Sequence, residues 1–298
     1  MTGKLFIDGI DAYTAYKVYV GQGGYNDIAS FPALKPFETN DWPDENGIEP
    51  DLAEPALDTR EVSIMFFGGD VEGFVEMLMV GAYHEWNFAE IGLTKTLRLV
   101  SNESYNDING LRHFSLRLAD DYPLEGYEYS APNKTGNTNY SIDDIDLGDY
   151  GITILQGSSD EVNKKAPVKK NLIVSLSKKA GINYDGYAAY RSSKDVNINC
   201  LMRCSVADFW HNYNALIYDL TRPYVRIFRG ENQVQECYYG GCEVSQLMPR
   251  DGGVWCVFDL KLVFTMKDIE IVPLLATENG YVIETEDGIY LIDMKKNG

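Results

Sequence analysis

Tyr16-Lys17-Val18-Tyr19-Val20 and Tyr150-Gly151-Ile152-Thr153-Ile154 follow one pattern, a tyrosine and then two alternating aliphatic residues, and they lie 134 positions apart. Two further pairs follow in the same order, Gly47-Ile48-x-x-Asp51 with Gly181-Ile182-x-x-Asp185 and Val71-x-x-Phe74 with Val206-x-x-Phe209. The second pair keeps the spacing of 134 positions, and the third is one position longer. Similar stretches in one order and at nearly one spacing predict a domain that is duplicated in tandem.

Length and composition agree with two strand-rich domains. The chain has 298 residues, which is enough for two domains with a core each. Hydrophobic residues make up 45% and aromatic residues 12%, with 21 tyrosines. Tyrosine and other aromatic residues are enriched in strands, so we expect a mainly β protein.

The net charge limits the possible partners. A formal charge of -19 repels phosphate backbones and anionic lipid, so we expect no general affinity for nucleic acid or membranes. The apolar run near Met1 is too short for a signal peptide. No stretch approaches the roughly 18 apolar residues that a membrane helix needs. We therefore expect a soluble protein made in the cytosol, with no membrane segment.

Hydrophobic periodicity predicts the elements of each half. Strands are expected at 4–7, 16–20, 60–66, 96–100 and 114–118 in the first half, and at 150–155, 196–202, 224–228 and 254–264 in the second. An apolar stripe from Val71 to Trp86 predicts a helix after an Asp70 N-cap. A second stripe from Val206 to Tyr218 follows Ser205, which has a capping-box spacing to Asp208.

These elements define the expected domains. We expect a first domain at 1–122, a polar linker at 123–144, a second domain at 145–267 and a C-terminal β-meander at 268–298. The meander rests on two turn signals, Asn279-Gly280 and Asp287-Gly288. The predicted fold class is mainly β (α+β), with two duplicated β-sandwich or barrel domains, each flanked by one amphipathic helix.

No catalytic or cofactor motif emerges from the sequence. His84, His113 and His211 have no partner at a spacing that builds a triad or a zinc protease site. The glycine-rich stretch at 21–24 lacks the lysine and the helix of a phosphate loop. The acidic stretch at 143–149 lacks the glycine and terminal glutamate of a calcium loop. We therefore predict no catalytic residue, no cofactor, no metal and no enzymatic activity.

The five cysteines lie in the second half of the chain, at 200, 204, 237, 242 and 256. Four of them can be drawn as a zinc site, but the spacing is loose and Cys200 lies in a strand-like run. The favoured interpretation is that they are free thiols acting as small buried hydrophobic residues.

The two long segments that precede each helix carry opposite charges. Between 38 and 61 there are nine acidic residues, at 38, 41, 44, 45, 49, 51, 54, 58 and 61, and one basic residue, Arg60. Between 157 and 194 there are eight basic residues, at 164, 165, 169, 170, 178, 179, 191 and 194, and three acidic ones. We hypothesise that the acidic segment of one unit faces the basic segment of another, within or between chains. The predicted interface comprises Trp42, Ile48, Asp51, Leu52, Lys164, Lys165, Lys169, Lys170, Lys178 and Lys179.

The order of a strand, a long irregular segment, a strand, a helix and closing strands, written twice, resembles the tail-tube and distal-tail family of tailed bacteriophages. The residues that carry the resemblance are Tyr16–Val20, Asn40–Glu49, Arg60–Phe66 and the helix from Val71, with their second-half counterparts between Tyr150 and Phe264. The linker and the final meander lie outside it.

The resemblance implies a structural component of a phage or prophage tail, of the distal-tail or baseplate-hub kind. It implies that the chain self-associates into a trimeric or hexameric ring, contacts other tail proteins and passes DNA as cargo without binding it specifically. The expected location is the virion tail, assembled in the bacterial cytoplasm. A carbohydrate-binding or adhesion module of a virion or cell surface remains the alternative, and a hydrolase with an unrecognised carboxylate pair is the third possibility.

Overall fold

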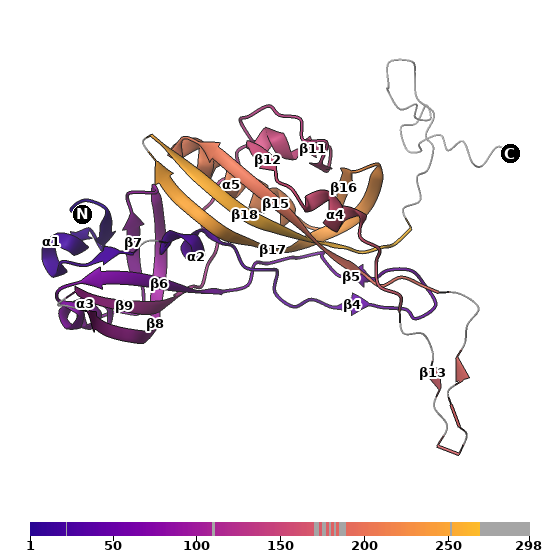
Figure 1. The fold of residues 1–298 in the computed structure, drawn as a ribbon, viewed down its shortest axis with the longest axis horizontal. Coiled ribbons are helices and arrows are strands. Elements are labelled where there is room, and N and C mark those ends of the chain that lie inside the picture. The colour runs from indigo at the N-terminus through magenta and orange to yellow at the C-terminus, as the bar shows by residue number, and fades with distance from the viewer. Residues whose placement is uncertain are drawn as a thin grey trace. The chain divides into compact units, whose positions relative to one another are not determined.

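The fold is mainly β. The computed structural model describes residues 1–21, 23–108, 111–169, 173–174, 177–178, 180–181, 183–184, 189–250 and 252–268. Two seven-stranded antiparallel sheets dominate these residues, one in each half of the chain (Figure 1). This confirms the predicted fold class at the level of a mainly β protein with few helices.

The first sheet has the strand order β2-β1-β7-β8-β9-β6-β3. Its strands are β1 (Leu5–Ile7), β2 (Ile10–Asp11), β3 (Tyr19–Val20), β6 (Arg60–Gly68), β7 (His84–Phe88), β8 (Leu93–Ile108) and β9 (Leu111–Asp120). The helices of this half are α1 (Ala12–Tyr16), α2 (Tyr25–Ala29) and α3 (Val71–Leu78). A hydrophobic core formed by alternate residues of the long strands, such as Val62, Ile64 and Phe66, packs beneath α3.

The second sheet has the strand order β11-β10-β16-β17-β18-β15-β12. Its strands are β10 (Ser141–Ile142), β11 (Ile145–Asp146), β12 (Ile152–Ile154), β15 (Lys194–Cys204), β16 (Arg226–Gly230), β17 (Gln233–Arg250) and β18 (Gly253–Phe264). The helices are the 3₁₀ helix η1 (Leu147–Tyr150), α4 (Ser158–Asn163) and α5 (Val206–Leu220).

The two sheets share one strand order. Counted from the first strand of each half, the order 2-1-7-8-9-6-3 becomes 11-10-16-17-18-15-12, with nine added to every number. A β-bulge lies between Leu99 and Ser101 of β8, and another lies between Tyr239 and Gly241 of β17. They lie opposite Leu118 and Leu262, which are equivalent residues of the two halves. This shared path is what a tandem duplication would leave, and it supports that proposal.

The same five-residue motif forms the first hairpin of both sheets. The sequence patterns considered above did not predict it. Ile7-Asp8-Gly9-Ile10-Asp11 and Ile142-Asp143-Asp144-Ile145-Asp146 each form a tight hairpin in which the first isoleucine pairs with the second. Both central residues have positive φ, at 49° and 78° in the first hairpin and 50° and 69° in the second. Two consecutive positive φ values are the signature of a type I′ turn, for which Asp and Gly are suited.

The first aspartate of each motif binds the same place on the neighbouring strand. Asp8 Oδ1 accepts from the backbone N–H of Glu85, and Asp143 Oδ1 accepts from that of Ile227, at 2.9 and 2.8 Å. The second oxygen meets a cationic or imidazole side chain, which is His84 for Asp8 and Arg226 for Asp143. Each hairpin is therefore fastened to its sheet by one carboxylate.

The two long helices begin as expected, but the first is shorter. Asp70 accepts from the N–H of Gly73, and Ser205 accepts from that of Asp208, as N-caps do. The equivalent residues Phe74 and Phe209 are fully buried. Helix α3 ends at Leu78, so the predicted continuation to Trp86 is wrong. Trp86 instead lies in β7, where it pairs with Ile7 and is buried in the core of the sheet.

The division into domains differs from the expectation in two places. Residues 1–267 form one compact unit, so the halves are not separate bodies. Strand β10 begins at Ser141, inside the expected linker at 123–144. The second half therefore begins earlier than expected, because the polar residues of the Ile-Asp hairpin turn have the composition of a linker. The expected meander at 268–298 lies outside the described residues, apart from Asp268.

None of the helices in the described part of the chain is both long and apolar enough to cross a lipid bilayer.

The carboxylate at the second hairpin yields a matched pair of variants. Asp143→Asn removes the charge that faces the largely buried Arg226, so we expect the free energy of unfolding to fall by about 1–3 kcal/mol. Asp144→Asn alters the next residue of the same turn, where the pair with Arg229 is exposed, and we expect a change within about 0.5 kcal/mol. Asparagine tolerates positive φ at both sites. Urea unfolding of the two variants tests this, and equal losses would contradict the proposed role of Asp143.

Candidate interaction interface

Each half projects a long segment that is closed at its base by the same backbone contacts. We call residues 34–57 arm 1 and residues 168–191 arm 2. Isolated bridges join Leu34 to Leu57 and Val168 to Arg191, which are the first and last residues of the arms. Inside each bridge, the N–H of the second arm residue donates to the carbonyl of the penultimate one, at 2.8 Å in both arms. The arms therefore have equal length and the same closure.

Each arm also contains a small hairpin. Strands β4 (Thr39–Asn40) and β5 (Glu49–Pro50) pair in arm 1, and β13 (Ile173–Val174) and β14 (Asn183–Tyr184) pair in arm 2. Both strands of the second hairpin lie 134 positions after those of the first. Two-residue strands cannot hold an arm by themselves, so each arm needs a surface on which to rest.

Arm 1 rests on the second half of the chain. The N–H of Gly47 donates to the carbonyl of Arg191 at 2.7 Å, and the N–H of Ile48 donates to that of Thr265 at 3.0 Å. Farther along, the carbonyl of Leu52 accepts from the N–H of Tyr224 at 2.7 Å. Ile48 and Leu52 are 8% and 4% exposed. Figure 1 shows β4 and β5 beside the second-half strands rather than the first sheet.

A single lysine at the base of arm 2 holds the tip of arm 1. The ammonium of Lys169 lies 2.6 Å from Asp41 Oδ1 and 2.7 Å from both the Trp42 and the Gly47 carbonyl oxygens. Only 6% of the Lys169 side chain is exposed. A buried ammonium is costly unless its N–H groups are bonded, and here each of its three donors has an oxygen acceptor. Lys169 therefore fixes the path of the chain from Asp41 to Gly47.

A second lysine binds two carboxylates of arm 1. Lys267 Nζ lies 2.8 Å from Glu45 Oε2 and 2.7 Å from Glu49 Oε1. The hydrogen bond from Lys267 holds the pKa of the Glu49 carboxyl below its ordinary value of 4.5. Hydrogen bonds to Glu45 and Glu49 raise the pKa of Lys267. These ion pairs are more exposed than that of Lys169, so their individual contributions are smaller.

Gly47 allows the close approach of the two backbones. Its φ is +72°, and a Cβ at this position would lie 2.2 Å from the Thr265 carbonyl oxygen. A side chain is therefore excluded both by the backbone conformation and by the contact.

A second seam joins the halves near α2. Phe31 and Cys242 form a backbone bridge, and the Tyr213 hydroxyl donates to the carbonyl of Ala29 at 2.9 Å. Asn26 donates to the Ser245 carbonyl and accepts from the N–H of Leu247, each at 2.8 Å. These contacts explain why residues 1–267 form one compact unit.

The structure gives the remaining predicted interface residues varied surroundings. Trp42 is 52% exposed, so it does not serve as a buried apolar anchor within one chain, and its carbonyl accepts from Lys169. Asp51, Lys165 and Lys178 are exposed, and Lys164 pairs at 3.6 Å with Glu161 of its own helix. Lys170 and Lys179 lie outside the described residues. Lys267 and the positioning role of Gly47 were missed, because only three-dimensional contacts reveal them.

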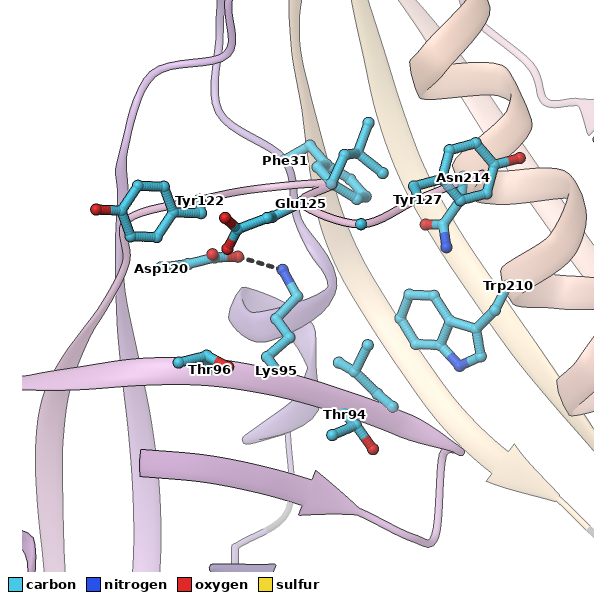
Figure 2. Close-up of a pocket in the computed structure, with 13 residues that line it drawn as sticks. Phe31, Thr94, Lys95, Thr96, Asp120, Tyr122, Glu125, Tyr127, Trp210 and Asn214 are labelled. Carbon is cyan, nitrogen blue, oxygen red and sulfur yellow. Dashed lines mark hydrogen bonds and ion pairs between the residues drawn. The ribbon is translucent and has the colours of Figure 1, made fainter. Parts of the chain in front are cut away.

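A polar pocket of about 290 Å³ lies along the boundary between the halves (Figure 2). Lys95 points into it and pairs with Asp120, while Trp210 and Asn214 face it from α5. The Lys95 ammonium also lies 5.1 Å from the centre of the Phe31 ring. Trp210 Nε1 donates to the Ile91 carbonyl at 2.6 Å, which ties α5 to the first half. The Lys95–Asp120 pair thus lies within the first half, and Trp210 makes the contact that joins the halves here.

The cysteines and histidines do not gather into a site within the described residues. All five thiols are free, and burial raises the pKa of Cys242 to about 12, so its thiolate is suppressed. No group of three or more His, Cys, Asp or Glu is placed to hold a metal in the part of the chain that the structure describes. His84 contacts Asp8 and the Leu78 carbonyl, and His211 contacts the Ala131 carbonyl.

No protein-family model matches the chain, and no curated protein matches it.

Removal of the Lys169 ammonium tests how arm 1 is held. In Lys169→Met the Trp42 and Gly47 carbonyls lose their donor, so we expect the free energy of unfolding to fall by about 1–3 kcal/mol. Hydrogen exchange at the amides of Gly47 and Ile48 should accelerate. Lys165→Met changes an exposed lysine nearby and should alter neither quantity. Unchanged exchange in Lys169→Met would show that other contacts hold the arm.

The Glu49 contact predicts a pH dependence. Because the folded-state pKa of Glu49 is lowered, its stabilising effect is present above the ordinary value of 4.5 and is lost as the pH falls through the folded-state pKa. The melting temperature of the wild type should therefore exceed that of Glu49→Gln near neutral pH. The two should converge in acid, as the pH falls through the lowered folded-state pKa of Glu49. A difference that stays unchanged through the acid titration of Glu49 would contradict the proposed ion pair.

Proposed function

We propose that the chain is a non-enzymatic structural protein that self-associates into a ring, of the distal-tail or baseplate-hub kind found in phage and prophage tails. The observation that carries this proposal is the docking of arm 1 on the second half. An arm from one copy of a repeated module rests on the next copy, and that arrangement extends naturally from halves of one chain to separate chains. We propose that two β-sandwich or barrel modules, derived by duplication, supply it.

Electrostatics support a role in which DNA passes without being retained. The formal charge of -19 repels a phosphate backbone, and much of the basic charge near the arms is occupied by carboxylates within the chain. Within this proposal the protein acts in the virion tail after assembly in the bacterial cytoplasm, where it contacts other tail proteins.

The alternative is a carbohydrate-binding or adhesion module. It has one favourable observation, a pair of exposed tyrosines, Tyr83 and Tyr122, whose ring centres lie 6.3 Å apart. Exposed aromatic rings can stack on sugars. We favour self-assembly because the Tyr83 hydroxyl is already bonded to Asp121.

Light scattering with negative-stain imaging tests the proposal. We expect annular trimers or hexamers, and we expect their fraction to fall when the salt concentration is raised to about 0.5 M, because charge pairs contribute to the contact. An assembly of unchanged mass at high salt would remove the charge-pairing hypothesis. A monomer at all concentrations that binds a glycan array would favour the alternative.

A further inference from the structure

In the part of the chain that the structure describes, arm 2 has no docking surface like that of arm 1, and the equivalent surface of the first half receives no arm. We propose that arm 2 of a second copy of this chain docks on the first half, at Lys35, Leu57 and Asp121. This contact would repeat the docking of arm 1 at Lys169, Arg191 and Thr265. The inference deepens the proposed self-association and rests on it, because it names the two surfaces that meet.

The register of hydrogen bonds establishes the equivalence of the two surfaces. The Lys35 N–H donates to the Ala56 carbonyl, and the Lys169 N–H donates to the Tyr190 carbonyl, so Lys35 corresponds to Lys169 and Leu57 to Arg191. Beyond each arm, the first residue of the next strand pairs with a late residue of the half: Arg60 of β6 pairs with Asp120 of β9, and Lys194 of β15 pairs with Phe264 of β18. Asp120 and Phe264 are therefore equivalent. The next residues, Asp121 and Thr265, therefore correspond as well.

The two equivalent lysines differ in what covers them. Lys169 is enclosed by the tip of arm 1 and has three oxygen acceptors, whereas Lys35 is exposed. Among the described residues, the Lys35 ammonium has no hydrogen bond or ion pair. The first half thus exposes a lysine ammonium at the position where, in the second half, the Lys169 ammonium binds the tip of arm 1. A long cationic side chain at this position fits the carbonyl-rich tip of an arm.

Arm 2 retains the glycine that arm 1 uses for docking. Gly181 lies 134 positions after Gly47 and has a φ of +87°, close to the +72° of Gly47. A Cβ at Gly47 would collide with the Thr265–Lys267 backbone, but one at Gly181 would meet nothing within 4 Å. Arm 2 therefore keeps the conformation suited to a close backbone contact without making one. The recurring Ile182 and Asp185 lie outside the described residues.

Exposed aromatic side chains lie next to Asp121, although the Asp121 carboxylate itself is largely buried and paired with Arg98. Tyr122 is 57% exposed, whereas Met266, its equivalent beside arm 1, packs against the core. Tyr83 contacts Tyr122, and the neighbouring Met79 and Val80 are 72% and 81% exposed. A second copy of the chain is the occupant that the structure favours, because the corresponding surface of the second half is already occupied by an arm of this chain.

The charges around the two contacts differ. Acidic arm 1 meets Lys169 and Lys267 on the second half. Basic arm 2 would meet the first half beside the acidic residues of arm 1, of which Glu54 is exposed. When arm 2 of one chain docks on the first half of another, the pair still has an undocked arm 2 on one chain and an unfilled first-half surface on the other. Such a head-to-tail contact continues until a ring closes or a filament forms.

Cross-linking between differently labelled chains tests the contact. We would place Ala180→Cys in one chain and Ala56→Cys in another, both in a Cys204→Ser background, because Cys204 is the one thiol that is not buried. Both alanines are exposed. A short bis-maleimide should join the mixed chains into a heterodimer, and either chain alone should give little product. The control Asn46→Cys with Tyr190→Cys, at the equivalent positions, should cross-link within one chain and leave the mass unchanged.

Sedimentation of Lys35→Met distinguishes the contact from self-association in general. We expect the dissociation constant of the assembly to rise about tenfold or more, with the stability of the monomer unchanged. Gly181→Ala should weaken association in the same way, and Lys261→Met, on the second sheet, should not. An assembly that forms normally in Lys35→Met and gives no mixed cross-link would overturn this contact while leaving self-association intact. A wild-type chain that stays monomeric at the highest attainable concentration would overturn both.

Discussion

The path of arm 1 over the second half depends on one buried ammonium. Arm 1 has almost no regular structure, since its hairpin consists of two strands of two residues. Its tip is held because Lys169 supplies three N–H donors to oxygens from Asp41, Trp42 and Gly47. Removal of a lysine side chain from water is unfavourable unless its donors are bonded, so the arm and the lysine depend on each other. The close backbone contact at Gly47 follows from this capture.

The two halves share a fold but place their arms in different situations. Both sheets begin with an Ile-Asp-x-Ile-Asp hairpin that a carboxylate fastens to the adjacent strand. Both arms are closed by the same bridge and the same hydrogen bond. Arm 1 finds its surface within the chain, whereas arm 2 has no further half on which to rest. This asymmetry, between modules of one strand order, is the physical basis for expecting association between chains.

The sequence predicted the mainly β class and the starts of both long helices, because hydrophobic periodicity and N-cap residues are local signals. It also drew attention to Lys169 through the opposite charges of the arms. It did not predict the end of α3, where Trp86 continues the apolar stripe of the helix but is buried in β7. Composition placed Ser141 in a linker, although the Ile-Asp motif beginning at Ile142 held a readable hairpin signal. The capture of arm 1 by Lys267 and the different exposure of Lys35 and Lys169 depend on which surfaces meet, and no local pattern carries that information.

A cryo-EM reconstruction of the assembled particle tests most directly whether the contact between the two halves of one chain is repeated between chains. The quantity to measure is the rotation that relates neighbouring halves. The account predicts that one rotation relates the first half of a chain to its second half, and that the same rotation relates the second half to the first half of the next chain. Lys35 of that next chain should then be covered by arm 2 of the first chain. A two-fold dimer in which Lys35 stays exposed to solvent would contradict it.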